Sequence, residues 1–242
     1  MIHLKEIDST NNYLKRAIAC STNLLEFTTV VANFQTGGRG QRGNGWEAER
    51  GKNLLFSTLV YPREVQAKEQ FLLSQLISLA VVETLELEGR GFSIKWPNDI
   101  YWNDLKIAGI LIENNLLGES IQNSVVGVGL NINQKRFSSS LPNPISLSVI
   151  TGKEYSILSI LSSILNKFKE LYQQINTVES RNSILLQYKQ HLYRREGFHL
   201  FEDSNGPFEA QIMDVHLDGK IWLQDTEGNN RGYYFKEVRY LI

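Results

Sequence analysis

The chain has 242 residues, with 25 lysines and arginines against 26 aspartates and glutamates, which gives a formal net charge of −1. A content of 42% hydrophobic and 21% charged residues excludes a disordered or collagen-like chain, and the neutral balance gives no indication of a nucleic-acid-binding surface. With one cysteine, Cys20, with no apolar signal sequence at the start, and with its longest apolar stretch, 71–82, broken by polar residues, we expect a cytoplasmic protein that does not enter a membrane.

The first 193 residues predict a mixture of strands and helices. Alternating or β-branched runs predict strands, helical spacing of apolar residues predicts helices, and Asp8, Ser9 and Thr10 provide N-cap chemistry for the first helix. In chain order these are a strand at 2–7, a helix at 11–20, strands at 28–34 and 54–61, a helix at 66–88, strands at 92–96, 99–102, 106–113 and 123–132, and helices at 156–175 and 180–193. Between 37 and 45, five glycines predict a mobile loop.

The last 46 residues differ from the rest of the chain. The short alternating runs FEAQIM, KIWLQ and GYYFKEV are separated by the turn sequences LDG and EGNN, which predicts a small antiparallel barrel. We expect a boundary near Arg194, with a larger domain at 1–194 and a barrel at 195–242. Because strands and helices do not alternate regularly, the predicted class is α+β, a mixed sheet flanked by helices.

The loop sequence GRGQRG at 38–43 matches the G-x-G-x-x-G expression, but its context argues against a dinucleotide site. That motif has to open a helix, and here Asn44, Gly45 and Trp46 follow instead. A glycine loop with Arg39 and Arg42 still offers backbone N–H groups and positive charge to a phosphate. The alternative is a solvated surface loop.

Three further segments place polar groups on or next to apolar strands. KWPND at 95–99 lies at the end of an apolar strand, which Pro97 terminates. KIAGILIE at 106–113 begins with a lysine and carries an internal glycine, and GVGLN at 127–131 ends in an asparagine. Each also has an ordinary structural explanation, as a turn, a bulge or a tightly packed strand. The four histidines lack metal-site spacing, so we expect no protein-bound metal.

The order of these segments, with DSTN at 8–11 and Gln35 before them, resembles the biotin protein ligase family over roughly residues 3–133. The resemblance implies the catalytic fold of biotin and lipoate ligases with a small SH3-like barrel behind it. Because the first motif begins at Asp8, there is no room for the N-terminal winged helix of repressor members. The expected protein is thus a stand-alone ligase that does not bind DNA.

The resemblance also implies site residues. The biotin pocket is expected to be formed by Ser9, Thr10, Asn11, Gln35, Gly38, Arg39, Gly40, Gln41, Lys106 and Gly109. The nucleotide is expected to contact Arg42, Trp46, Asn98 and Asn131. The catalytic group is expected to comprise Lys95, Asp99, Lys106, Arg39 and Arg42. Loop 37–46 is expected to close over biotin and the adenylate.

The implied chemistry joins two anions. Biotin's carboxylate attacks the α-phosphate of ATP, and the two groups repel each other. One cation about 4 Å from an anion contributes roughly 4 kcal/mol of attraction at an effective dielectric of about 20. Several cations and a Mg²⁺ counter-ion are therefore expected to offset the repulsion. Biotinyl-AMP then reacts with a lysine of a biotin carboxyl carrier protein, a domain of a carboxylase. Asp99 is our hypothetical base, which normal transfer from preformed biotinyl-AMP by an Asp99→Asn variant would exclude.

Two departures from the common family pattern and two alternative functions accompany this interpretation. Gln41 and Asn44 stand where basic residues are frequent, which predicts some leakage of biotinyl-AMP. A lipoate or octanoate ligase is the alternative enzyme, and an effector-binding module that senses biotin or a nucleotide is the non-catalytic alternative. The resemblance leaves monomer and homodimer both open.

Overall fold

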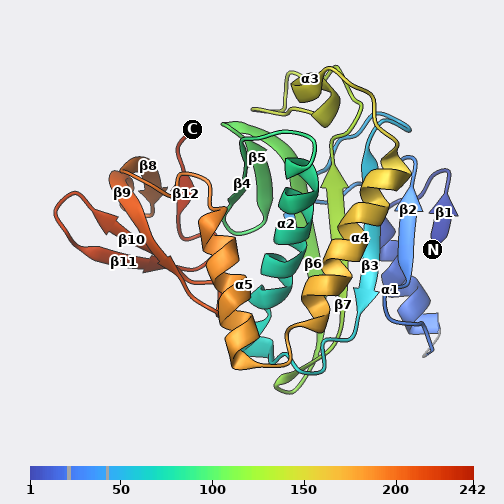
Figure 1. Cartoon of the computed structure of the whole chain (residues 1–242), viewed down its shortest axis with the longest axis horizontal. Coiled ribbons are helices and arrows are strands. Elements are labelled where there is room, and N and C mark those ends of the chain that lie inside the picture. The colour runs from blue at the N-terminus through green and yellow to red at the C-terminus, as the bar shows by residue number, and fades with distance from the viewer. Residues whose placement is uncertain (21–22, 42–43) are drawn as a thin grey trace.

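The main sheet has seven strands, and its order places the chain's central segments in the middle (Figure 1). The computed structural model describes residues 1–20, 23–41 and 44–242. Across the sheet the order is β1 (Ile2–Leu4), β2 (Thr29–Ala32), β3 (Leu54–Val60), β7 (Ser120–Leu130), β6 (Leu105–Leu117), β5 (Asp99–Trp102) and β4 (Phe92–Lys95). Only the β1–β2 pair among these neighbours is parallel, so the sheet is mixed, as predicted.

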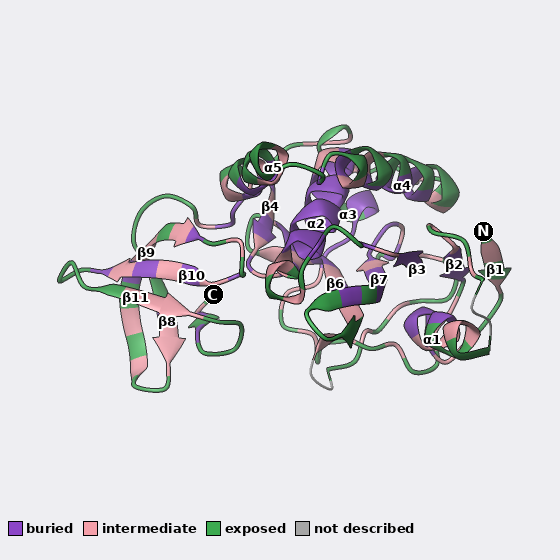
Figure 2. Ribbon diagram, turned by 90° about the horizontal axis from the view of Figure 1, so that it is seen from below, coloured by how far each residue is buried: buried purple, intermediate pink, exposed green. Residues whose placement is uncertain are grey.

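Helices cover both faces of this sheet (Figure 2). On one face lie α2 (Phe71–Glu86), α4 (Ile157–Gln173) and α5 (Val178–Gln190), and α1 (Thr10–Cys20) lies on the other. The α2 helix is buried on nearly every side because α4 and α5 cover it, whereas α4 buries one stripe at helical spacing, from Ile160 to Leu171. The single helix α1 leaves part of its own face of the sheet for a cleft.

The C-terminal region forms a second sheet of five strands, all antiparallel, as predicted for 197–242. Its order is β11 (Asn230–Tyr233), β10 (Ile221–Asp225), β9 (Gly206–Val215), β8 (His199–Asp203) and β12 (Arg239–Tyr240). It adjoins the end of the main sheet next to β4, where Trp96 Nε1 donates a hydrogen bond to the Gly219 carbonyl at 3.0 Å. The exact boundary at residue 194 remains a prediction.

Several elements differ from the sequence prediction. The hairpin of β6 and β7 extends to Leu117, beyond the predicted end at 113, because two asparagines and two leucines after Glu113 continue the ladder at the exposed end of the sheet. The elements β8, β12 and α3 (Leu147–Thr151) were not predicted, and the predicted helix at 66–88 is divided into the 3-10 turn η2 (Ala67–Glu69) and α2. The segment GYYFKEV leaves the ladder after Tyr233, and an isolated bridge then joins Phe235 to Val238. Short elements carry too few residues to show a period.

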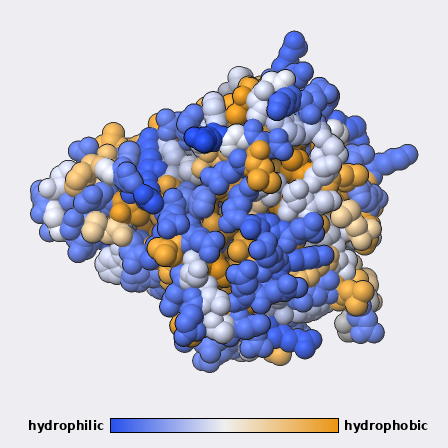
Figure 3. Space-filling model, in the orientation of Figure 1, coloured by the Kyte–Doolittle hydropathy of each residue, from blue (hydrophilic) through white to orange (hydrophobic). Residues whose placement is uncertain are grey.

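Surface character agrees with this arrangement. On the face seen in Figure 3, hydrophobic residues form small patches between hydrophilic ones, since the helices turn their apolar stripes towards the sheet. Within the described ranges, no helix combines the length and the apolar composition needed to cross a bilayer.

Candidate active site

A cleft of about 500 Å³ opens between α1, the main sheet and the C-terminal sheet. Its size is in the range of small-molecule sites. Most of the predicted site residues line it: Ser9, Thr10, Asn11, Gln35, Arg39, Gly40, Gln41, Trp46, Lys95, Asn98, Asp99, Lys106 and Gly109. Among the described residues, Gly38 and Asn131 are outside the lining, and Arg42 lies outside the described residues. The structure thus brings together segments that are up to 100 residues apart in the chain.

The start of α1 forms the polar end of the cleft. Ser9, Thr10 and Asn11 are each 3% exposed, although all three are polar. Gln35 Oε1 accepts hydrogen bonds from the Thr10 backbone N–H at 2.7 Å and from its hydroxyl at 3.1 Å. Ser57 lies 2.7 Å from the Thr10 hydroxyl and 2.5 Å from Asn11 Oδ1. Buried polar groups with fixed partners suit the recognition of a small polar head group.

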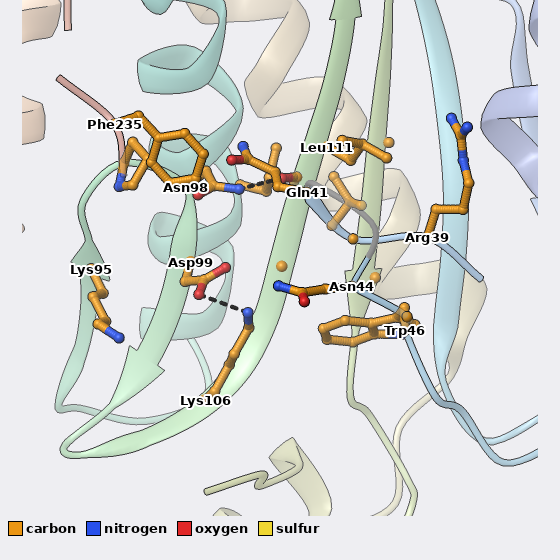
Figure 4. Close-up of a pocket in the computed structure, with 18 of the residues that line it drawn as sticks. Arg39, Gln41, Asn44, Trp46, Lys95, Asn98, Asp99, Lys106, Leu111 and Phe235 are labelled. Carbon is orange, nitrogen blue, oxygen red and sulfur yellow. Dashed lines mark hydrogen bonds and ion pairs between the residues drawn. The ribbon is translucent and has the colours of Figure 1, made fainter. Parts of the chain in front are cut away.

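Two lysines and one aspartate form the charged end of the cleft, on β4, β5 and β6 (Figure 4). Lys106 Nζ lies 2.6 Å from Asp99 Oδ2. Lys95 Nζ donates to the Tyr101 hydroxyl at 3.1 Å and lies 5.4 Å from the centre of the Tyr240 ring. Burial lowers the pKa of Lys95, and Lys106 and Arg194 act in the same direction against the attraction of Asp99. Two lysines against one aspartate nevertheless give this end of the cleft an excess of basic groups, which suits an anion.

Glycines on the central strands make room for side chains of the chain itself. A Cβ at Gly129 would lie 2.5 Å from the Trp46 ring, and one at Gly109 would lie 3.1 Å from it. A Cβ at Gly127 would collide with Asn11 Oδ1. The sequence had suggested close approach at Gly109, and the approaching group is Trp46. The Trp46 ring therefore lies flat against β6 and β7, and its Nε1 has no hydrogen-bond partner among the described residues.

The described part of the glycine loop is more regular than predicted. Trp46 N–H donates to the Gly38 carbonyl at 3.0 Å, and Gly40 N–H donates to the Asn44 carbonyl at 2.6 Å, so the two sides of the loop pair like a hairpin. A Cβ at Gly38 would collide with the Trp46 carbonyl, which gives this glycine a local backbone role. Its predicted contact with a ligand stays a prediction.

Two predicted asparagines are engaged by the backbone. Asn98 Nδ2 donates to the Ile110 carbonyl at 2.5 Å, at the edge of the cleft. Asn131 Nδ2 donates to the Ile145 carbonyl at 3.0 Å, and the buried Oδ1 has no partner among the described residues. Asn131 is not among the residues that line the cleft, and its predicted reading of a base edge stays a prediction.

Sequence reasoning missed two groups near the cleft. The C-terminal sheet contributes Phe235, Lys236, Val238, Arg239 and Tyr240 to the lining. These residues belong to no motif, and nothing local in the sequence signals them. The second group is Glu113, which has no predicted role, although a carboxylate that ends an apolar strand is a usable signal. Arg39 Nη2 lies 2.6 Å from Glu113 Oε2 and points away from Lys106 and Asp99 (Figure 4).

Comparison with known proteins identifies relatives of the chain. The biotin/lipoate A/B protein ligase family matches residues 4–131. The bifunctional ligase/repressor BirA of Bacillus subtilis is 28% identical over 220 residues, which cover 88% of this chain and 66% of that protein. A biotin--[acetyl-CoA-carboxylase] ligase of Paracoccus denitrificans is 35% identical over 132 residues, or 53% of each chain. The chain therefore spans slightly less than two thirds of the length of the first relative.

Solved structures give a fuller match in length. The biotin protein ligase from Aquifex aeolicus, in a complex with biotin and ATP, superposes with a TM-score of 0.82 at 27% sequence identity. The match covers 99% of this chain and 98% of the Aquifex chain, so it includes the C-terminal sheet. This agreement supports the predicted α+β class in both parts of the chain.

Proposed function

The chain belongs to the biotin/lipoate A/B protein ligase family, and from this premise we propose that it is an ATP-dependent biotin protein ligase. It forms biotinyl-AMP from biotin and ATP, releases pyrophosphate, and transfers biotin to a lysine of a biotin carboxyl carrier protein or domain. The observation that carries the proposal is the two-ended cleft, with buried hydrogen-bonding groups at α1 and lysines at β4 and β6. Because the reaction consumes ATP, we place it in the cytoplasm.

In the first step the cleft neutralises charge. A carboxylate oxygen of biotin forms a bond to the α-phosphorus, the bond from that phosphorus to the bridging oxygen breaks, and pyrophosphate leaves. Lys95 and Lys106 stabilise the negative charge that gathers on the phosphate oxygens. Ser9, Thr10 and Gln35 hold the ring end of biotin, so that its carboxylate points along the cleft towards the lysines. Trp46 covers the sheet and keeps water from the mixed anhydride.

In the second step a lysine amine of the carrier attacks the acyl carbon, AMP leaves and the amine gives up a proton. Asp99 is the proposed acceptor of this proton, and its pairing with Lys106 keeps it at the charged end of the cleft. Among the described lining residues Asp99 is the only carboxylate, and the described residues hold no group of three or more side chains suited to a metal ion. These residues do not form a metal cage, so Mg²⁺ is proposed only as the counter-ion of ATP.

Pyrophosphate release tests the proposed function. The protein is incubated with ATP and Mg²⁺, with either biotin or lipoate and without carrier. Release with biotin alone is expected. Release with lipoate alone would instead assign the cleft to the lipoate branch of the family. Binding of biotin without release from either acid would favour an effector-binding module.

Gln41 predicts imperfect retention of the intermediate. It lines the cleft with a neutral amide, and an arginine there would add a charge-assisted hydrogen bond to the adenylate. We expect the natural chain to label lysines of a bystander protein in dilute solution about tenfold more than its Gln41→Arg variant, the ratio that one such bond would give. Streptavidin blotting of the bystander measures both, at matched rates of pyrophosphate release. Equal labelling would contradict the prediction.

Lys95 predicts the alkaline limit of the first step. Because burial lowers its pKa, the charged form is lost as pH rises through a range below the ordinary lysine value of about 10.4, and adenylation falls with it. Lys95→Arg keeps the charge at all working pH values, so the alkaline limb should move upwards. Tyr101 next to Lys95 has its pKa raised by burial to about 12 and does not titrate in this range. An unmoved limb in Lys95→Arg would assign the limit to another group.

A further inference from the structure

Glu113 on β6 connects two elements of the cleft, the start of α1 and the glycine loop. Its Oε2 accepts from Asn11 Nδ2 at 2.9 Å and from Arg39 Nη2 at 2.6 Å, and its Oε1 accepts from Lys15 Nζ at 2.9 Å. The Glu113 side chain is 25% exposed. Burial acts to raise the pKa of Glu113, but the hydrogen bonds from Lys15, Asn11 and Arg39 outweigh it, so the group is held in its charged form.

The pairing with Glu113 fixes the orientation of the Asn11 amide. Asn11 Nδ2 is shared between Glu113 and the Leu111 carbonyl, at 2.9 and 3.3 Å, and both of these partners only accept. The amide must therefore present its oxygen on the other side, where Ser57 donates to it at 2.5 Å. Gly127 leaves the space for this arrangement. A change at Glu113 would thus release the amide orientation at the polar end of the cleft.

The same carboxylate determines where the Arg39 charge lies. The guanidinium faces Glu113 and α1, and in Figure 4 it is turned away from the group of Lys95, Asp99 and Lys106. Its backbone neighbours, Gly38 and Gly40, are held by the hairpin bonds of the loop. Arg39 therefore ties the loop to β6, a role different from the direct contact with a carboxylate or phosphate that the family resemblance implied.

We propose that Glu113 is a positioning residue for the biotin end of the cleft, and that Arg39 acts through Glu113 instead of contacting the phosphates. The inference rests on the proposed function. The Glu113 carboxylate accepts hydrogen bonds from Asn11 and Arg39, and in this way holds Asn11 and the glycine loop in the geometry that receives biotin. The phosphate end, built on Lys95 and Lys106, does not depend on it.

The test compares Glu113→Gln with Arg39→Ala. In both variants calorimetry without ATP should show biotin affinity lowered by about tenfold, the loss expected for a charged hydrogen bond. With biotin saturating, the KM for ATP of Glu113→Gln should stay within about twofold of the natural chain, because Lys95 and Lys106 are untouched. Lys15→Ala is the matched control, because it removes a donor from the same carboxylate without touching Asn11 or Arg39, and its biotin affinity should stay within about twofold.

The double variant separates the two possible roles of Arg39. If Arg39 acts through Glu113, then Arg39→Ala costs no further biotin affinity in the Glu113→Gln background. A rise of tenfold or more in the KM for ATP in Arg39→Ala, with Glu113→Gln near normal, would overturn the proposal. If Glu113→Gln fails to fold, the biotin affinity of Arg39→Ala can still be compared with that of Lys15→Ala, because Arg39 is half-exposed. Unchanged biotin binding in Arg39→Ala overturns this inference alone, whereas a natural chain that binds no biotin overturns the proposed function as well.

Discussion

Replacing Lys106 with methionine is expected to lower the rate of pyrophosphate release by about 10³-fold, with the fold intact. One cation about 4 Å from a phosphate oxygen contributes roughly 4 kcal/mol at an effective dielectric of about 20, which corresponds to that factor in rate. The substitution also leaves Asp99 without the partner that lies 2.6 Å away. An uncompensated carboxylate would then repel the two anionic substrates.

The Asp99 contribution can be measured separately. In the double variant Lys106→Met with Asp99→Asn the repulsion is gone, and the rate should recover by about tenfold relative to Lys106→Met alone. Lys135→Met is the matched control. The Lys135 side chain is 67% exposed and pairs with Glu154 at 3.7 Å, outside the cleft lining, so the rate of this variant should stay within about twofold. A Lys106→Met rate within tenfold of the natural chain would remove Lys106 from the charged group.

Local patterns in the sequence were sufficient for most of the fold. The strands β3 and β7 and the helix α2 have the apolar content of buried elements, α4 has the helical period of a half-buried one, and the structure confirms all four elements. The predicted mobility of the glycine loop stays a prediction. The backbone pairs Gly38 with Trp46 across the loop, a contact that residue type alone does not encode.

The candidate site shows the same division between local and distant information. Lys95, Asp99 and Lys106, which the motifs single out, lie together at one end of the cleft, because all three are on neighbouring strands of a short antiparallel segment. The pairing of Arg39 with Glu113 spans 74 residues and depends on how the loop crosses β6. The position of Tyr240 depends on how the second sheet adjoins the first. Neither follows from a pattern within one segment.

Replacing Gly129 with alanine is expected to lower the rate of pyrophosphate release by about 100-fold while the free energy of unfolding changes by only about 1 kcal/mol. The new methyl group would lie 2.5 to 2.9 Å from three atoms of the Trp46 ring, so the ring has to leave β7. Overpacking of this kind costs about 1–3 kcal/mol. Because Trp46 is hydrogen-bonded to Gly38 across the glycine loop, the loop moves with the ring and relieves the collision. The core beneath β7 does not change.

Two comparisons decide whether Trp46 is the reason for that loss. Gly89→Ala introduces the same methyl group at a site where the nearest atom, in the Phe92 ring, is 3.8 Å away from it. This variant should keep the rate of pyrophosphate release within about twofold. In a Trp46→Ala background, Gly129→Ala should cause no further loss, because the ring that the methyl group strikes is gone. If Gly129→Ala still costs 100-fold in that background, the glycine is needed for the approach of a substrate to β7. If Gly129→Ala costs nothing in that background, the glycine serves to leave room for Trp46 against the sheet, and the tryptophan in turn holds the loop over the cleft.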